Sequence, residues 1–183
     1  MPKDRPAHLA ISKSEVVFEG KIWDIKRESF EYNGGTLVRE FVAHPGAVAI
    51  LAVDAEQRVL LIRQYRHPVR SYLWEIPAGL LDVPGESLES AARRELIEET
   101  SHDAKYFEKL ITFHPSPGGN SESITIFLAR ECFEVSNQFE PTGEERDLQP
   151  TWVNLDEALS SVMASEIQNP SAMVAILALS QRL

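Results

Sequence analysis

The sequence has one cysteine, no long apolar run and few basic residues. Cys132 alone can form no internal disulfide and no cysteine-based zinc site. The longest apolar run, residues 47–53, is far shorter than the roughly 20 residues that span a bilayer. The first ten residues also lack the apolar stretch of a signal peptide. We therefore expect a cytoplasmic protein that does not bind membranes.

The shortage of basic residues limits the possible partners. There are 18 Lys and Arg against 28 Asp and Glu, so the formal net charge is −10. Such a surface disfavours non-specific binding to nucleic acid or anionic lipid. Clustered carboxylates can nevertheless bind a metal ion, which would supply the positive charge for an anionic substrate. The 183 residues suit one compact domain with a small appendage.

The N-terminal part of the chain has the pattern of a small β unit. Residues 15–44 are rich in β-branched and aromatic residues, and Asn33-Gly34-Gly35 interrupts them. This turn sequence predicts a hairpin between strands at 21–32 and 36–44. The first ten residues are polar and are expected to be disordered. We predict that residues 1–45 form a tail and a separate β unit.

The remaining residues, 46–183, alternate strand and helix patterns. Nearly continuous apolar runs at 48–53 and 59–65 predict strands buried on both faces, joined by a turn. A helix is predicted over 87–100, with Ser87 as its N-cap. Together these elements indicate a mixed α/β sheet with helices on its faces. The other predicted elements are a strand that leads into a loop at 74–79, strands at 107–113, 123–134 and around Trp152, and helices that begin near Leu155 and at Pro170 after the N-cap Asn169.

The helix at 87–100 carries a glutamate cluster. Glu95, Glu98 and Glu99 have the spacing i, i+3, i+4, which places three carboxylates on one face. Their mutual repulsion is unfavourable, whereas a hard divalent cation would favour them. A solvated acidic face is the alternative for such a spacing taken alone. The predicted apolar stripe of the same helix consists of Leu88, Ala91, Ala92 and Leu96.

Residues 79–102, GLLDVPGESLESAARRELIEETSH, resemble a Nudix box. The family pattern is G-x5-E-x7-R-E-U-x-E-E-x-G-U, in which U is a bulky aliphatic residue. Gly79 opens the box, Glu86 is the isolated glutamate and residues 94–99 form the REUxEE core. The chain departs from the pattern by one extra loop residue before Glu86, by Ser101 in place of the glycine and by His102 in place of an aliphatic residue.

A second set of residues indicates a branch of this family. RQYR at 63–66, followed by WEIPAG at 74–79, is similar to the ADP-ribose pyrophosphatases, which also have a proline at the place of Pro117. The resemblance covers about residues 18–159. It implies a Nudix-type α/β/α sandwich for residues 46–183, and homodimers formed through the N-terminal β unit.

The resemblance also implies a reaction and a set of catalytic groups. ADP-ribose would be hydrolysed to AMP and ribose 5-phosphate with two or more Mg²⁺ ions, or Mn²⁺, in the site. Arg94 would orient the carboxylates, and Glu145, or else Glu144, would help to activate the water. An ordinary acidic surface loop is the alternative for these two glutamates. The implied metal ligands are Glu95, Glu99 and the backbone carbonyl of Ala78, with Glu98 as a further ligand or supporting group.

Substrate contacts are expected from arginines and aromatic residues. Arg66, Arg39 and Arg63 are candidates to bind phosphate or the terminal ribose. Trp23 could stack on the adenine, and a packed core or interface position is the alternative. Pro117 marks a loop beside the site.

Two other functions remain open at this stage. The same chemistry could act on another nucleoside-diphosphate sugar or on NADH. A non-catalytic module that senses ADP-ribose is an alternative of another class, although the glutamates of the box are all present.

Overall fold

The computed structural model describes residues 1–136, 139 and 143–182, and the chain divides into two compact units. Unit 1 comprises residues 1–45 and 116–122, and unit 2 comprises residues 46–115 and 123–183. The sequence pattern alone suggests one boundary after residue 45. The segment 116–122 nevertheless belongs to unit 1, although it is distant in the sequence from the other residues of that unit.

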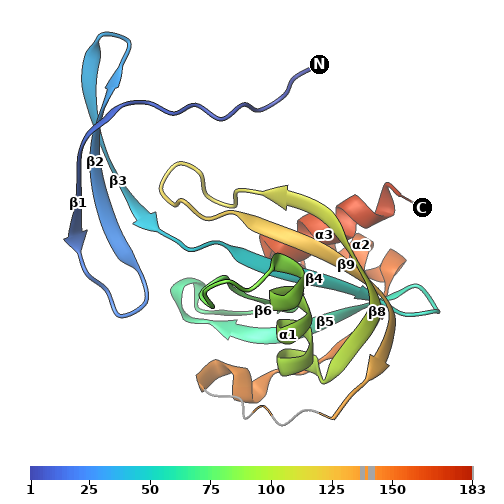
Figure 1. Cartoon of the computed structure of the whole chain (residues 1–183). Helices are drawn as coiled ribbons and strands as arrows, with labels where there is room; N and C mark the ends of the chain where they lie inside the picture. The colour runs from blue at the N-terminus through green and yellow to red at the C-terminus, as the bar shows by residue number, and fades with distance from the viewer. Residues whose placement is uncertain (137–138, 140–142, 183) are drawn as a thin grey trace. The chain divides into compact units, whose positions relative to one another are not determined.

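Unit 1 is a three-stranded antiparallel sheet in the order β1 (Ile11–Phe18), β2 (Asp24–Tyr32) and β3 (Gly35–Ala43) (Figure 1). The predicted hairpin is confirmed, because Asn33 and Gly34 join β2 to β3 with φ of 51° and 80°. Positive φ at both positions is what a type I′ turn requires. The start of β1 is not evident from the sequence, because its side chains are almost all exposed and lack a buried alternating face.

Cross-strand pairs and a returning loop hold unit 1 together. Arg27 on β2 lies opposite Glu15 on β1 and Glu40 on β3, and it forms ion pairs with both, at 3.6 and 2.6 Å. The backbone of Val42 exchanges hydrogen bonds with the segment 116–122, donating to Gly119 at 3.0 Å and accepting from Ser121 at 3.1 Å. This pairing explains why the segment clusters with unit 1.

Unit 2 contains a seven-stranded mixed sheet. The main strand order is β10-β5-β4-β9-β8, with β6 paired to β5 and β7 paired to β4. Strands β4 and β9 are parallel, and the other pairs are antiparallel. The strands are β4 (Ala47–Val53), β5 (Arg58–Arg66), β6 (Ser71–Glu75), β7 (Ala78–Leu80), β8 (His102–Phe113), β9 (Ile124–Glu134) and β10 (Thr151–Asn154).

Two helices of unit 2 have the predicted N-caps, Ser87 and Asn169, and the third is capped by Asn154, which was not predicted. Ser87, Asn154 and Asn169 each accept a hydrogen bond from a backbone N–H of the first helical turn. Pro170 occupies the first position of the last helix, where its missing N–H has no cost. The helices are α1 (Leu88–Thr100), α2 (Leu155–Met163) and α3 (Pro170–Ser180), with short 3-10 helices η1 (His67–Val69) and η2 (Gly143–Asp147).

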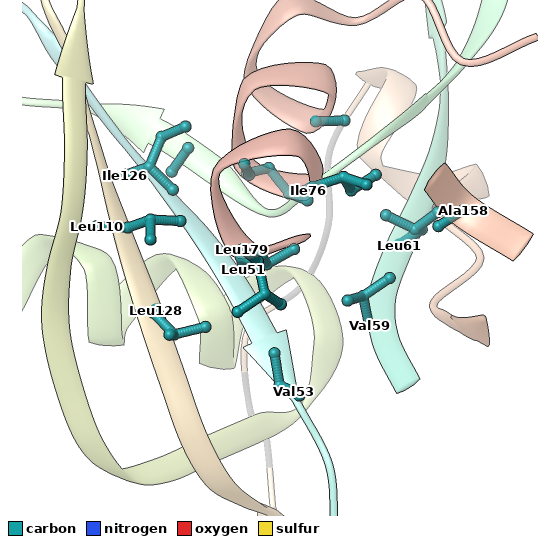
Figure 2. Close-up of a cluster of buried hydrophobic side chains, with 14 of the residues drawn as sticks. Leu51, Val53, Val59, Leu61, Ile76, Leu110, Ile126, Leu128, Ala158 and Leu179 are labelled. Atoms are coloured by element: carbon teal, nitrogen blue, oxygen red, sulfur yellow. The ribbon is translucent and has the colours of Figure 1, made fainter. Parts of the chain in front are cut away.

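Strand β4 is buried on both faces, as its sequence predicts. Leu51 and its alternate neighbours pack in a cluster with α2 and α3, and Figure 2 shows Leu51 close to Leu179 of α3. Ile50 and its alternate neighbours pack with α1 on the opposite face. A sheet with an apolar cluster on each face and helices over both is an α/β/α sandwich, so the predicted fold class is confirmed.

Two local predictions are wrong. The segment 74–79 does not end in a loop, because β6 ends at Glu75 and a second strand, β7, begins at Ala78 and pairs with a different neighbour. Leu88 is 39% exposed and does not belong to the buried stripe of α1. Thr100 is buried in its place, with its hydroxyl bonded to the carbonyl of Leu96.

None of the helices in the described part of the chain has the length and hydrophobicity that crossing a bilayer requires.

The exit of α1 yields a stability prediction. Ser101 is left-handed, with φ of 57° and ψ of 31°, where glycine avoids a steric cost. We expect Ser101→Gly to stabilise the fold by up to about 1 kcal/mol. Chemical denaturation measures this difference. Ser101→Ala is the control, because alanine keeps the Cβ atom. An equal gain from both variants would show that the left-handed conformation is not the cause.

Candidate active site

Helix α1 presents the glutamate cluster at the surface of the sheet. Ala91, Ala92 and Leu96 are buried against the sheet, which fixes the rotation of α1 about its axis. The small alanines allow close approach of the helix to the strands. The carboxylates of Glu95, Glu98 and Glu99 therefore project at the margin of this contact.

Arg94 lies among three of the carboxylates. Its Nε and Nη2 atoms donate to Glu86 at 3.1 and 3.0 Å, and its Nη1 atom donates to Glu95 at 2.5 Å and to Glu98 at 3.2 Å. These hydrogen bonds hold the pKa of the Glu86 carboxyl below its usual value and raise the pKa of Arg94. The repulsion between the carboxylates is thus offset by a guanidinium from the same helix.

The fourth carboxylate, that of Glu99, is hydrogen-bonded to strand β7. Its Oε2 atom accepts a hydrogen bond from the backbone N–H of Ala78 at 2.9 Å. Gly79 follows directly, and a Cβ atom at this position would overlap the carboxylate of Glu95. Glycine at this position therefore leaves room for the Glu95 carboxylate, and β7 brings Ala78 beside two glutamates of α1.

The chemistry of these donors fits a hard divalent cation. Four carboxylates and a nearby backbone segment offer oxygen atoms only, which suit Mg²⁺ or Mn²⁺ better than softer metals. Among the residues that the structure describes, no group of three His, Cys, Asp or Glu side chains stands at metal-binding spacing. The cluster is arranged around the guanidinium of Arg94, so an ion would compete with Arg94 for Glu95 and Glu98.

A cavity of about 790 Å³ opens along the outer side of α1. Ser90, Arg93, Ile97 and Phe139 are among its lining residues. Arg94 and Glu98 also line it, which places the cavity next to the carboxylate cluster. Its position leaves room for a ligand beside the cluster.

The two candidate arginines of unit 2 contact other side chains. Arg66 donates from Nε and Nη2 to the two carboxylate oxygens of Glu75, at 2.9 and 2.7 Å. The guanidinium of Arg63 lies over the ring of Tyr72, 4.9 Å from its centroid. Arg66 is thus held in a defined orientation by a residue that sequence reasoning did not single out.

The other candidate substrate residues belong to unit 1. Trp23 stacks on His44 with ring centroids 4.5 Å apart, and His44 in turn lies 3.4 Å from Glu122. Arg39 on β3 donates to the carbonyl of Val38 at 2.8 Å. Pro117 lies in the segment that pairs with β3.

The candidate water-activating glutamates lie in η2, which contacts β5. The side chains of Glu144 and Glu145 are outside the described residues. The backbone of both residues forms part of a 3-10 helix that lies against β5.

Sequence reasoning missed Glu75 as a site residue. It is 2% exposed and lies at the end of β6. A carboxylate that is removed from water needs a cationic or hydrogen-bonding partner. An acidic residue inside the otherwise apolar run WEIP was the signal that could have identified it.

The contact between Gly79 and Glu95 yields a prediction. Gly79→Ala should displace the Glu95 carboxylate, which is the mobile end of a side chain, and leave the fold intact. We expect Mn²⁺ affinity to fall roughly tenfold, as for other losses of support around a metal site. Mn²⁺ titration followed by electron paramagnetic resonance measures this affinity, and thermal unfolding monitors the fold.

Gly35→Ala is the matched control, because a Cβ atom there meets no other atom within 4 Å. Unchanged Mn²⁺ affinity in Gly79→Ala would remove the Glu95 carboxylate from the metal site.

Comparisons with known proteins show which family the chain belongs to. The model of the NUDIX domain matches residues 43–173. The chain is 39% identical over 166 residues to the ADP-ribose pyrophosphatase of Mycobacterium tuberculosis, covering 90% of this chain and 80% of that protein. It is also 39% identical over 163 residues to the ADP-ribose pyrophosphatase of Bacillus subtilis, covering 88% and 87%.

A solved structure shares the fold. The crystal structure of an ADP compounds hydrolase superposes with a TM-score of 0.79 and 23% identity, covering 99% of this chain and 97% of that chain. The match to the family model includes the glutamate cluster, Arg94 and Gly79. On these grounds the chain belongs to the Nudix family of hydrolases.

Proposed function

We propose that this Nudix hydrolase cleaves the pyrophosphate bond of ADP-ribose, with AMP and ribose 5-phosphate as products. The carboxylates gathered around Arg94 beside β7 carry the proposal, because they provide a site for the cations that a diphosphate needs. The identity to two ADP-ribose pyrophosphatases over most of the chain supports this substrate.

The proposed cofactor is Mg²⁺, or Mn²⁺, with two or more ions in the site. Glu95 and Glu99 would hold the metal together with the carbonyl of Ala78, and Glu98 would be a further ligand. Bound divalent cations supply charge neutralisation on the phosphoryl oxygens and a more acidic water. The ion pairs of Arg94 hold the carboxylates of Glu86, Glu95 and Glu98 close together.

The remaining roles fall to the chain's own acids and arginines. Glu145 is the preferred acceptor of the proton from the attacking water, and Glu144 is the alternative. Arg66 would bind the diphosphate, since a guanidinium pairs with phosphate oxygens through two donors. Arg39, Arg63 and Pro117 are further candidates for substrate contact. Trp23 would stack on the adenine.

The test of this function is AMP release from ADP-ribose with Mg²⁺, with GDP-mannose and NADH assayed in parallel. We expect ADP-ribose to be cleaved fastest and EDTA to abolish the reaction. Glu99→Gln should keep the fold but lower turnover by roughly 10²–10³-fold, because it removes a metal-binding charge next to the reacting phosphate.

Each other result of this assay has a defined meaning. Faster cleavage of GDP-mannose or NADH would keep the chemistry and change the substrate. Tight ADP-ribose binding without any cleavage would indicate a sensor. A Glu99→Gln variant with normal rates would exclude Glu99 from the site.

We further propose a homodimer that forms through unit 1 of a cytoplasmic protein. Ile11, Val16, Phe18 and Val38 on β1 and β3 are at least half exposed. Exposed apolar side chains on a small sheet favour association with a second chain. The isologous contact of a two-fold dimer would cover the same patch on both copies.

Light scattering should therefore give twice the chain mass of 20.6 kDa. Phe18→Glu should shift the mass toward that of the monomer, because it places a charge in the proposed interface. Val69→Glu is the control, since Val69 is equally exposed but lies in unit 2. A wild-type chain that is monomeric at micromolar concentration would contradict the proposal.

A further inference from the structure

Strand β6 ends in a buried carboxylate. Glu75 is 2% exposed and pairs across the sheet with Ile62 of β5, which is also buried. Moving a carboxylate out of water is costly unless a cation and hydrogen bonds compensate for it. The carboxylate of Glu75, in an otherwise apolar region, therefore requires a partner that compensates for its burial.

Glu75 forms a two-point contact with Arg66. The Nε and Nη2 atoms of Arg66 donate to the two carboxylate oxygens, at 2.9 and 2.7 Å. Two parallel bonds fix both the position and the plane of a guanidinium, which one bond would not do. The Nη1 atom takes no part in this contact, and the Arg66 side chain is 45% exposed. The pair thus joins a buried anchor to a cation that solvent reaches.

The register of β5 and β6 shows how the Arg66 side chain reaches Glu75 past Gln64. Arg66 lies opposite Ser71, whereas Glu75 lies four residues further along β6, so the Arg66 side chain extends back along the sheet. Gln64 lies between these two levels on the same face of β5. Its Oε1 atom is buried and is the one buried side-chain atom without a hydrogen-bond partner in the described part of the chain.

This polar group lies on the strand that η2 contacts. Strand β5 also connects to β4, which pairs with β7 beside the glutamates of α1. The charge of Arg94 is shared by three carboxylates, so it attracts a further anion weakly. Arg66 is better placed to receive a phosphate, provided that its orientation is maintained.

We propose that Glu75 is a positioning residue for substrate binding: its two-point contact holds the guanidinium of Arg66 in the orientation in which it meets the diphosphate. The inference rests on the proposed function, in which Arg66 binds that group. It predicts that substrate affinity depends on the direction of the guanidinium as well as on its charge.

Two variants distinguish the effect of the orientation of the Arg66 guanidinium on substrate affinity from the effect of its charge. Glu75→Gln keeps the size of the side chain but replaces one acceptor oxygen by an NH₂ group, so only one of the two bonds can form. Arg66→Lys keeps the charge that compensates Glu75 but loses the planar two-point contact. Since Arg66 is partly exposed, the second variant should fold even if Glu75→Gln does not. The matched controls are Asp54→Asn and Arg58→Lys, a carboxylate–arginine pair with a 2.7 Å contact at the other end of β5.

The measurements are KM and kcat for ADP-ribose with Mg²⁺, thermal unfolding, and ADP-ribose binding by calorimetry in EDTA. We expect each variant to raise KM and Kd roughly tenfold, with kcat changed less than KM. The double variant should be little worse than either single variant, because both remove the same orientation. The controls should leave KM and Kd unchanged.

A lower thermal stability with unchanged KM and Kd would overturn the proposal and leave a purely structural ion pair. Additive effects of the two substitutions would also overturn it. A wild-type chain that binds ADP-ribose without cleaving it would refute the proposed hydrolysis, while the binding measurements still test Glu75. A wild-type chain that neither binds nor cleaves ADP-ribose would refute both proposals.

Discussion

Carboxylates that share one face of a helix repel one another, and the site of this protein depends on how that repulsion is offset. Arg94 provides the compensation within the helix itself, with hydrogen bonds to Glu86, Glu95 and Glu98. A divalent cation brings twice the charge to a smaller volume, so it can replace the guanidinium as the partner of the carboxylates. The cluster is therefore assembled by the side chains of the chain itself.

Close packing brings the cluster to the sheet. Ala91 and Ala92 allow α1 to lie close to β4, and Gly79 leaves space for the carboxylate of Glu95. Glu99 then reaches the backbone N–H of Ala78. A larger side chain at any of these small residues would separate the helix from the strands or displace a carboxylate. The small residues of the Nudix box thus have a spatial role that complements the chemical role of its glutamates.

The motifs RQYR and WEIPAG lie side by side in the folded chain. They form adjacent antiparallel strands, and the last arginine of the first motif contacts the glutamate of the second. The second motif also crosses from β6 to β7 and so delivers Ala78 and Gly79 to α1. One short segment therefore supports both the candidate phosphate-binding arginine and the candidate metal site.

Local sequence determined the elements whose signals are local. The Asn33-Gly34 turn, the N-caps Ser87 and Asn169 and the wholly apolar strand β4 follow from backbone preference and hydrophobic pattern, and the structure has them as predicted. The sequence also indicated the Nudix box, because seven fixed positions lie within two turns of helix and one loop. Exposed strand β1 left no such pattern, since alternation marks a strand only when one face is buried.

Tertiary structure decided the contacts between residues that are distant in the sequence. Glu75 pairs with Arg66 on another strand, and Thr100 rather than Leu88 is buried on α1. The segment 116–122 joined unit 1 through backbone pairing with β3. Sequence periodicity records the environment of each element alone, whereas burial of a charge or a hydrogen bond depends on which surfaces meet.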